Sequence, residues 1–270
     1  MQPLRTAAAV IRAFWVALVG GTVTAILATQ ILVANWLGLT KTLGKICQRN
    51  PTWSSRIILW ASGVKVEWEG IERLRGQGPR VLVSNHESWF DPIALTANLP
   101  GEYRFAIKKE LEKVPLWGAA WQACGHISVD RYNRQAAIQS MDRARQISGE
   151  NADTLIVFFP EGTRSPTGAL QRFKKGAFVL ALQLGAPVIP VAVIGGRQIM
   201  AKNRMRIRSG RIKVVVGEPI AVAGMTFDDR HVLVEGARAA IAALRGGEGP
   251  TDPPDRGGCQ GNDRYADDRG

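Results

Sequence analysis

The longest stretch without a charged side chain runs from Ala13 to Thr40, and it limits the possible folds more than any other feature. As one helix it would be roughly 42 Å long, against about 30 Å for the hydrocarbon core of a bilayer. The stretch is longer than the apolar core of a secretory signal, and no convincing cleavage site follows it. We therefore expect it to be retained as a membrane-associated helix.

Two placements in a membrane fit this stretch. Polar residues such as Gln30 and Asn35 dilute it, and a second apolar piece, Ile57 to Val64, follows. One spanning helix and two helices lying in one leaflet are both compatible with the pattern. A buried helix of a soluble core is the remaining alternative, although core helices are rarely so long and charge-free. Basic residues after the run favour a cytoplasmic position for the rest of the chain, at the inner or plasma membrane; they are Lys41, Lys45, Arg49 and Arg56.

Net charge and cysteine content indicate the kind of partner and the redox state of the thiols. The net charge of +12 suggests an anionic partner, which could be a lipid surface, a phosphorylated substrate or nucleic acid. The three cysteines, Cys47, Cys124 and Cys259, are odd in number and widely spaced. We therefore predict reduced cytoplasmic thiols and neither a disulfide framework nor a zinc site.

From about Val64 the pattern becomes that of a globular α/β domain. Seven segments read as strands: Val64–Trp68, Arg80–Asn85, Tyr103–Lys108, Gly125–Val129, Thr154–Phe159, Val188–Ile194 and Arg211–Val216. Helices are expected at Ile93–Asn98, Asn133–Ser148, Phe173–Leu184 and His231–Leu244. This alternation predicts a mostly parallel or mixed sheet flanked by helices. We expect three parts: membrane-associated helices at 1–62, a catalytic domain at 63–245 and a disordered tail at 246–270.

A histidine and an aspartate stand at the end of one predicted strand. His86 follows the apolar run Val81–Val83, and Asp91-Pro92 resembles a helix start with Asp at the N-cap. Across the turn the carboxylate could orient the imidazole and stabilise its protonated form, as a general base requires. Alone, the spacing is common by chance, and Asp91 could be only a helix cap.

Further polar residues follow neighbouring strands, and parallel strands would bring them to the same edge of the sheet. Arg131 and Arg164 carry planar guanidinium groups suited to a phosphate, and Lys108 adds a point charge. Gly162 would let the backbone approach a ligand closely. Each could instead be an ordinary surface or turn residue. Ser88 is expected to be a turn or cap residue, and His126 and His231 to be structural.

Four ordered segments resemble the glycerolipid acyltransferases, specifically the lysophosphatidate acyltransferases. They are Asn85–Asp91, Gly125–Arg131, Phe159–Ser165 and Val188–Ala192, within a resemblance that covers about residues 64 to 220. Lys108–Leu111 and Phe173–Phe178 also match. The main departure is His126 and Ser128, where bulkier apolar residues are common, which could alter the acceptor pocket.

The resemblance implies a direct acyl transfer with His86 as the base and Asp91 as its partner. The donor would be acyl-CoA or acyl-acyl carrier protein, and the acceptor lysophosphatidate from the membrane. It implies that Lys108, Arg131 and Arg164 hold the acceptor's phosphate, with Glu161, Gly162 and Thr163 shaping the site. No metal or other cofactor is expected.

Other functions stay open at this point. The same chemistry could act on another lysophospholipid or on the lyso form of an amino-acid lipid. A hydrolase would need a nucleophile or Lewis acid, and no Gly-x-Ser-x-Gly elbow is present. Nucleic-acid binding is suggested by charge alone, and the charge-free run argues against it. Acyl-chain preference, the donor's carrier and the oligomeric state do not follow from the sequence.

Overall fold

The computed structural model describes residues 2–129 and 153–246. Three sequence predictions lie outside these residues: Arg131, the helix at Asn133–Ser148 and the tail beyond Gly246.

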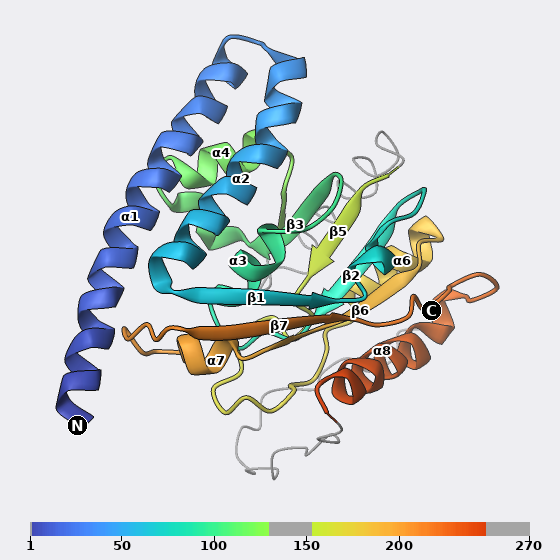
Figure 1. The fold of residues 1–270 in the computed structure, drawn as a ribbon. Helices are drawn as coiled ribbons and strands as arrows, with labels where there is room; N and C mark the ends of the chain where they lie inside the picture. Colours follow the sequence, from blue (N-terminus) through green and yellow to red (C-terminus); the bar gives the residue numbers. More distant parts are fainter. Residues whose placement is uncertain (1, 130–152, 247–270) are drawn as a thin grey trace, which may run out of the picture.

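Two helices form an N-terminal hairpin, with α1 (Gln2–Trp36) rising along one side of the protein and α2 (Thr40–Ser62) returning to the sheet (Figure 1). Among the described residues one helical stretch, Ala8–Trp36, is long and apolar enough to cross a membrane, and only 22% of its apolar window is buried. The second helix runs without interruption through Pro51, so the second apolar piece is its last part up to Ser62, and Val64 already belongs to the first strand. Gly63, in the left-handed region at φ 67°, ends the helix.

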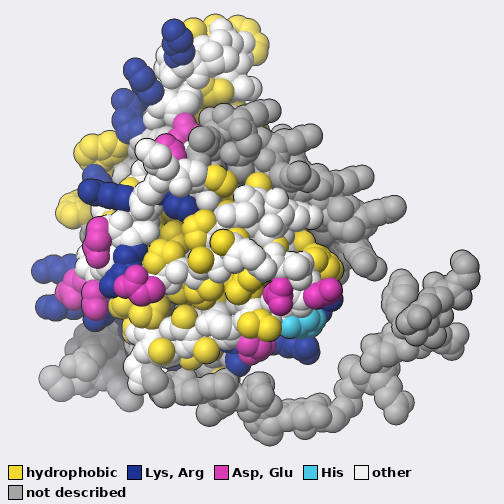
Figure 2. Space-filling model, turned by 90° about the vertical axis from the view of Figure 1, so that its right-hand side faces the viewer, with side chains coloured by type: hydrophobic (Ala, Val, Ile, Leu, Met, Phe, Trp, Pro, Cys, Tyr) yellow, Lys and Arg dark blue, Asp and Glu magenta, His cyan; other side chains and the backbone are white. Residues whose placement is uncertain are grey.

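The tip of the hairpin exposes large apolar side chains. Trp36 is 83% exposed, and Leu37 and Leu39 beside it are about half exposed. Figure 2 shows hydrophobic side chains at this upper end, with lysine and arginine side chains along its flank. Apolar and aromatic residues flanked by cations are typical of a membrane interface.

Seven strands form one mixed sheet in the order β1-β7-β6-β2-β5-β3-β4. They are β1 (Val64–Glu69), β2 (Arg80–Ser84), β3 (Tyr103–Lys108), β4 (Ile127–Val129), β5 (Leu155–Phe158), β6 (Val188–Ile194) and β7 (Gly210–Val216). All neighbouring pairs of these described strands are parallel except β6 and β7, which are antiparallel. The predicted mixed α/β fold is confirmed.

The antiparallel pairing of β6 with β7 determines which strand ends lie at each edge of the sheet. The five strands from β6 to β4 end at one edge, where their carboxyl termini collect. Because β7 and β1 run the other way, they begin at this edge, with Val64 opposite Gly210. The backbone N–H of Gly210 donates to the carbonyl of Gly63, directly after α2. The hairpin therefore joins the sheet at the edge where the central strands end.

Helices cover both faces of the sheet, as the apolar residues of β2 require. Val81 and Val83 pack in a cluster with α6 (Gly176–Leu184) and α8 (Arg230–Leu244), whereas Leu82 points to the opposite face. That face is covered by α2 and α3 (Phe90–Thr96), with Val16 of α1 in the same cluster. The short helices α4 (Trp117–Ala123) and α7 (Gly196–Ile199) and three 3-10 turns complete the described part; the turns are Ile71–Leu74, Lys109–Lys113 and Phe227–Asp229.

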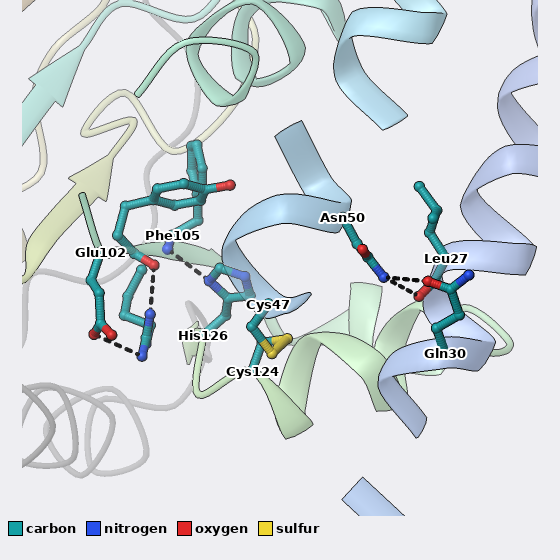
Figure 3. Close-up of a disulfide and its surroundings, with 10 residues drawn as sticks. Leu27, Gln30, Cys47, Asn50, Glu102, Phe105, Cys124 and His126 are labelled. Atoms are coloured by element: carbon teal, nitrogen blue, oxygen red, sulfur yellow. Dashed lines mark hydrogen bonds and ion pairs between the residues drawn. A yellow bond between two sulfur atoms is a disulfide. The ribbon is translucent and has the colours of Figure 1, made fainter. Parts of the chain in front are cut away.

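The expectation of reduced thiols is wrong for two of the three cysteines. Cys47 of α2 and Cys124, at the end of α4, form a disulfide across 77 residues of sequence, with their Cα atoms 5.4 Å apart (Figure 3). Both are buried in an apolar cluster of α1, α2 and α4. The pairing depends on helix packing, which cysteine spacing alone does not reveal. Cys259 lies outside the described residues.

Removing this disulfide is expected to destabilise the protein by about 2 to 4 kcal/mol, because the crosslink restricts a long loop of the unfolded chain. Cys47→Ser should therefore lower the melting temperature in detergent by several degrees. Cys259→Ser is the control. A titration that finds all three thiols free in non-reduced protein would contradict the pairing.

Candidate active site

The predicted histidine–aspartate pair is formed at the edge where the central strands end. His86 follows β2, and its Nδ1 lies 2.9 Å from Oδ2 of Asp91 in the first turn of α3. Asp91 is fully buried, whereas the His86 side chain keeps 15% of its surface exposed. A buried carboxylate thus holds one nitrogen of a ring that ligands can still reach.

The helix start differs in detail from the prediction. Helix α3 begins at Phe90, so Asp91 is its second residue and not its N-cap. The same Oδ2 atom accepts the backbone N–H groups of Glu87 and Ser88, at 2.6 and 2.7 Å. The aspartate thus satisfies amides of the preceding turn, as a cap would, while holding the imidazole. Ser88 is a local cap as expected, since its Oγ accepts the N–H of Phe90.

Ring packing and hydrogen bonding together fix the imidazole. Phe159, directly after β5, stacks on His86 with the ring centroids 4.3 Å apart. An ionised Asp91 accepts a hydrogen bond from Nδ1–H, which leaves Nε2 as the nitrogen that can accept a proton. This geometry is the one that a general base requires, and the role of His86 as that base stays a prediction.

The second oxygen of Asp91 lies against a glycine. Oδ1 is buried and has no hydrogen-bond partner among the described residues. Gly196, the first residue of α7, lies so close that a Cβ added there would collide with this oxygen. Only glycine lets α7 approach the aspartate in this way.

Glu161 links the two loops of the site. Its Oε1 accepts the backbone N–H of His86 at 2.8 Å, and its Oε2 accepts the side-chain amide of Gln171 at 2.8 Å. Burial raises the pKa of this carboxyl group, and the hydrogen bonds from His86 and Gln171 counteract part of the rise. The contacts position His86, and a direct contact of Glu161 with substrate stays a prediction.

A predicted arginine lies beside the pair. The guanidinium of Arg164 lies over the ring of Trp89, 4.8 Å from its centroid, and partial burial lowers its pKa while Asp91 raises it. Lys202 adds a second cation, because its Nζ contacts Oγ1 of Thr163 at 3.2 Å and the carbonyl of Arg164 at 2.9 Å. The sequence prediction did not include Lys202, which comes from the segment between α7 and β7.

Three predicted site residues remain, and the structure describes the position and contacts of two of them. Gly162 adopts φ 73°, and the side chain of Lys174 packs over it. Lys108 ends β3 at the same edge and forms an ion pair with Glu110 at 3.0 Å. Arg131 lies outside the described residues. The structure thus brings the described candidates to one edge, and their contacts with substrate remain predictions.

Two further residues brace the loop that carries His86. Asn85 exchanges hydrogen bonds with the backbone of Val193, at 2.8 Å in each direction, and so joins the ends of β2 and β6. Glu87 forms a buried ion pair with Arg245, at 2.8 Å, beyond the end of α8. Asn85 belongs to the motif found in the sequence, whereas no sequence signal pointed to Arg245.

His126 is structural, in agreement with the prediction. Its Nδ1 accepts the backbone N–H of Phe105 at 3.1 Å (Figure 3), and Trp121 stacks on its ring. Burial, assisted by Arg104, lowers its pKa to about 3, so the ring is neutral at physiological pH. Near the disulfide it packs the end of α4 against β3.

Comparisons with known proteins agree with this fold. The crystal structure of the 1-acyl-sn-glycerophosphate (LPA) acyltransferase, PlsC, from Thermotoga maritima superposes with a TM-score of 0.73, covering 90% of this chain and 98% of that one at 21% identity. At that identity the match defines the fold. The sequence profile of the Acyltransferase family matches residues 65–194.

Proteins with similar sequences are acyltransferases as well. Human 1-acyl-sn-glycerol-3-phosphate acyltransferase alpha is 34% identical over 191 residues, which are 69% of this chain and 66% of the relative. The 1-acyl-sn-glycerol-3-phosphate acyltransferase of Limnanthes alba is 36% identical over 64% of this chain and 60% of its own length. The chain thus spans somewhat less than two thirds of these relatives. It belongs to the acyltransferase family.

Proposed function

We propose that this protein transfers an acyl chain from acyl-CoA or acyl-acyl carrier protein to the sn-2 hydroxyl of 1-acyl-glycerol-3-phosphate, giving phosphatidate. The observation that carries the proposal is the His86 imidazole, held through Nδ1 by the buried Asp91. Two curated relatives with this activity in their names support the choice of substrates.

In the proposed reaction Nε2 of His86 removes the proton of the acceptor hydroxyl. The oxygen attacks the thioester carbonyl directly, without an acyl-enzyme. Asp91 stabilises the imidazolium that forms. When the tetrahedral intermediate collapses, the C–S bond breaks and the thiolate takes the proton from His86. Each turnover therefore restores the neutral base. No metal or cofactor is part of the proposal.

Cations near the base would hold the phosphate of the acceptor. Arg164 offers a planar group already oriented by Trp89, and Lys202 lies beside it. Lys108 at the end of β3, and Arg131 from the segment that follows β4, complete the proposed set. Gly162 and Thr163 would line the acceptor site next to Arg164.

We propose that residues 1–62 attach the protein to the membrane, and that residues 63–245 form the catalytic domain on the cytoplasmic side. The exposed apolar tip of the hairpin and the basic residues of α2 support this placement. Disulfides persist mainly in oxidising compartments, but Cys47 and Cys124 are buried in an apolar cluster that shields them from soluble reductants.

An assay of purified protein with a radiolabelled acyl donor and a panel of lysolipids tests the function and the clamp together. We expect phosphatidate from lysophosphatidate. Arg164→Ala should raise the acceptor's KM about tenfold or more, because a charge-assisted contact is lost, with the donor's KM unchanged. Arg172→Ala, at an exposed arginine nearby, is the control. Transfer only to acceptors without a phosphomonoester would contradict the proposed acceptor, and loss of donor binding in Arg164→Ala would contradict the clamp.

A further inference from the structure

Glu87 is an unusual neighbour for a catalytic pair, because it adds a buried carboxylate to two others. Its side chain is 8% exposed. Its pKa is raised to about 7: burial is the largest cause and Asp91 and Glu161 also raise the pKa, while Arg245 and a hydrogen bond from Asn85 counteract part of the rise. A carboxylate here needs a cation to remain ionised.

Arg245, the residue directly after α8, supplies that cation. Its Nη2 donates to Oε1 of Glu87 at 2.8 Å and to the carbonyl of Gly168 at 2.6 Å. The arginine side chain is 15% exposed, so the pair is largely removed from water. One guanidinium thus joins the loop after β2 to the loop after β5.

A short series of contacts leads from this guanidinium to the base. The backbone N–H of Glu87 donates to Oδ2 of Asp91, and the same oxygen holds Nδ1 of His86. The Gly168 loop is tied to His86 as well. Ser165 donates its N–H to the carbonyl of His86 at 2.7 Å, and its Oγ accepts the N–H of Gly168 at 3.0 Å. Arg245 therefore braces both backbone segments that orient the imidazole.

We propose that Arg245 is a positioning residue for the acyl transfer, which fixes the His86–Asp91 pair by holding Glu87 and the Gly168 loop. This inference rests on the proposed function. Arg245 contacts neither member of the catalytic pair directly, so it acts on the orientation of the base. Its loss would leave Glu87 as a buried carboxylate facing Asp91 and Glu161. The loop would then rearrange or Glu87 would take up a proton.

The central test is a set of four variants assayed for both kcat and KM. We expect Arg245→Ala to lower kcat by about 10- to 100-fold, the usual effect of a small misplacement of a catalytic group, with both KM values little changed. Arg245→Lys should restore part of the loss. The double variant Glu87→Gln/Arg245→Ala should be more active than Arg245→Ala, because the unpaired charge is gone. The matched control is Arg211→Ala, which breaks the exposed pair with Glu67.

The pH profile separates positioning from a general loss of stability. The groups that face Glu87 are Arg245 directly after α8, Asp91 of α3 and Glu161 after β5, while Arg197 of α7 packs against Gly168. Loss of Arg245 removes a contribution that lowers the pKa of Glu87. The activity of Arg245→Ala relative to the wild type should therefore fall as the pH rises and Glu87 ionises without a partner. The Glu87→Gln/Arg245→Ala variant should not show this fall.

A proton NMR spectrum provides a readout that does not depend on turnover. The chain has three histidines, so the Nδ1–H resonance of His86 can be assigned by its loss in His86→Ala. We expect this resonance to shift or broaden in Arg245→Ala and to stay unchanged in Arg211→Ala. A wild type that acylates no lysolipid would refute the proposed function, and the resonance would still test Arg245. The inference would be overturned by an unchanged resonance with a normal kcat. It would also be overturned if neither Arg245→Lys nor the added Glu87→Gln substitution recovered activity relative to Arg245→Ala.

Discussion

Replacement of His86 by alanine is expected to lower kcat by about 10² to 10⁴-fold, the usual contribution of a general base. Without the imidazole, water must remove the proton of the acceptor hydroxyl. The KM values should change little, because the proposed clamp of Arg164 and Lys202 is built from other segments. Initial rates with saturating donor and acceptor measure the effect.

The control for His86→Ala is His231→Ala, which removes an exposed histidine of α8. Both variants should melt close to the wild type, since the His86 side chain is partly exposed and its loop is held by Asn85 and Glu161. A folded His86→Ala protein with nearly normal turnover would rule out the base assignment.

Asp91→Asn is expected to cause the second largest loss, of about 10²-fold or more in kcat, because the neutral amide cannot stabilise the imidazolium. The amide can also turn its NH₂ group toward Nδ1, which would favour the tautomer with its proton on Nε2. The base would then be blocked at the nitrogen that faces the hydroxyl. Steady-state rates over a range of pH measure both consequences.

A control variant and a stability measurement are needed to interpret the activity of Asp91→Asn. Asp153→Asn alters an exposed aspartate that accepts the N–H of Gly78 at 2.8 Å, and it should leave kcat unchanged. Chemical denaturation should show that Asp91→Asn is still folded, although the N–H groups of Glu87 and Ser88 lose a charged acceptor. If kcat remains within a few fold of the wild type, the aspartate acts only as a cap.

Much of the fold was predictable because the strands follow short-range rules. Apolar runs such as Val188–Ile194, buried except for its last residue, leave few alternatives to a central strand, and Gly185 ends α6 in the left-handed conformation. The position of β7 was not predictable. It pairs antiparallel with β6 and parallel with β1, and the pairing with β1 joins segments that lie far apart in the sequence.

The site was predictable where its residues follow strands directly. His86 and Glu161 meet because β2 and β5 are parallel neighbours, a consequence of strand order that the motif spacing only suggests. Lys202, Gly196 and Arg245 were missed because each reaches the site from a segment without a local motif. The disulfide was missed for the same reason, since Cys47 and Cys124 meet through helix packing.

The reversed direction of β1 and β7 has a consequence for how a lipid could travel through the protein. The hairpin joins the sheet at Gly63, on the edge that carries His86, and the N–H of Ile207 reaches the carbonyl of Ala9 near the start of α1. If the acceptor is a lysolipid, as proposed, a tail beside α1 and the hydroxyl at His86 would lie on the same edge of the sheet. Such a layout favours sideways exchange with a bilayer over extraction of single molecules into water.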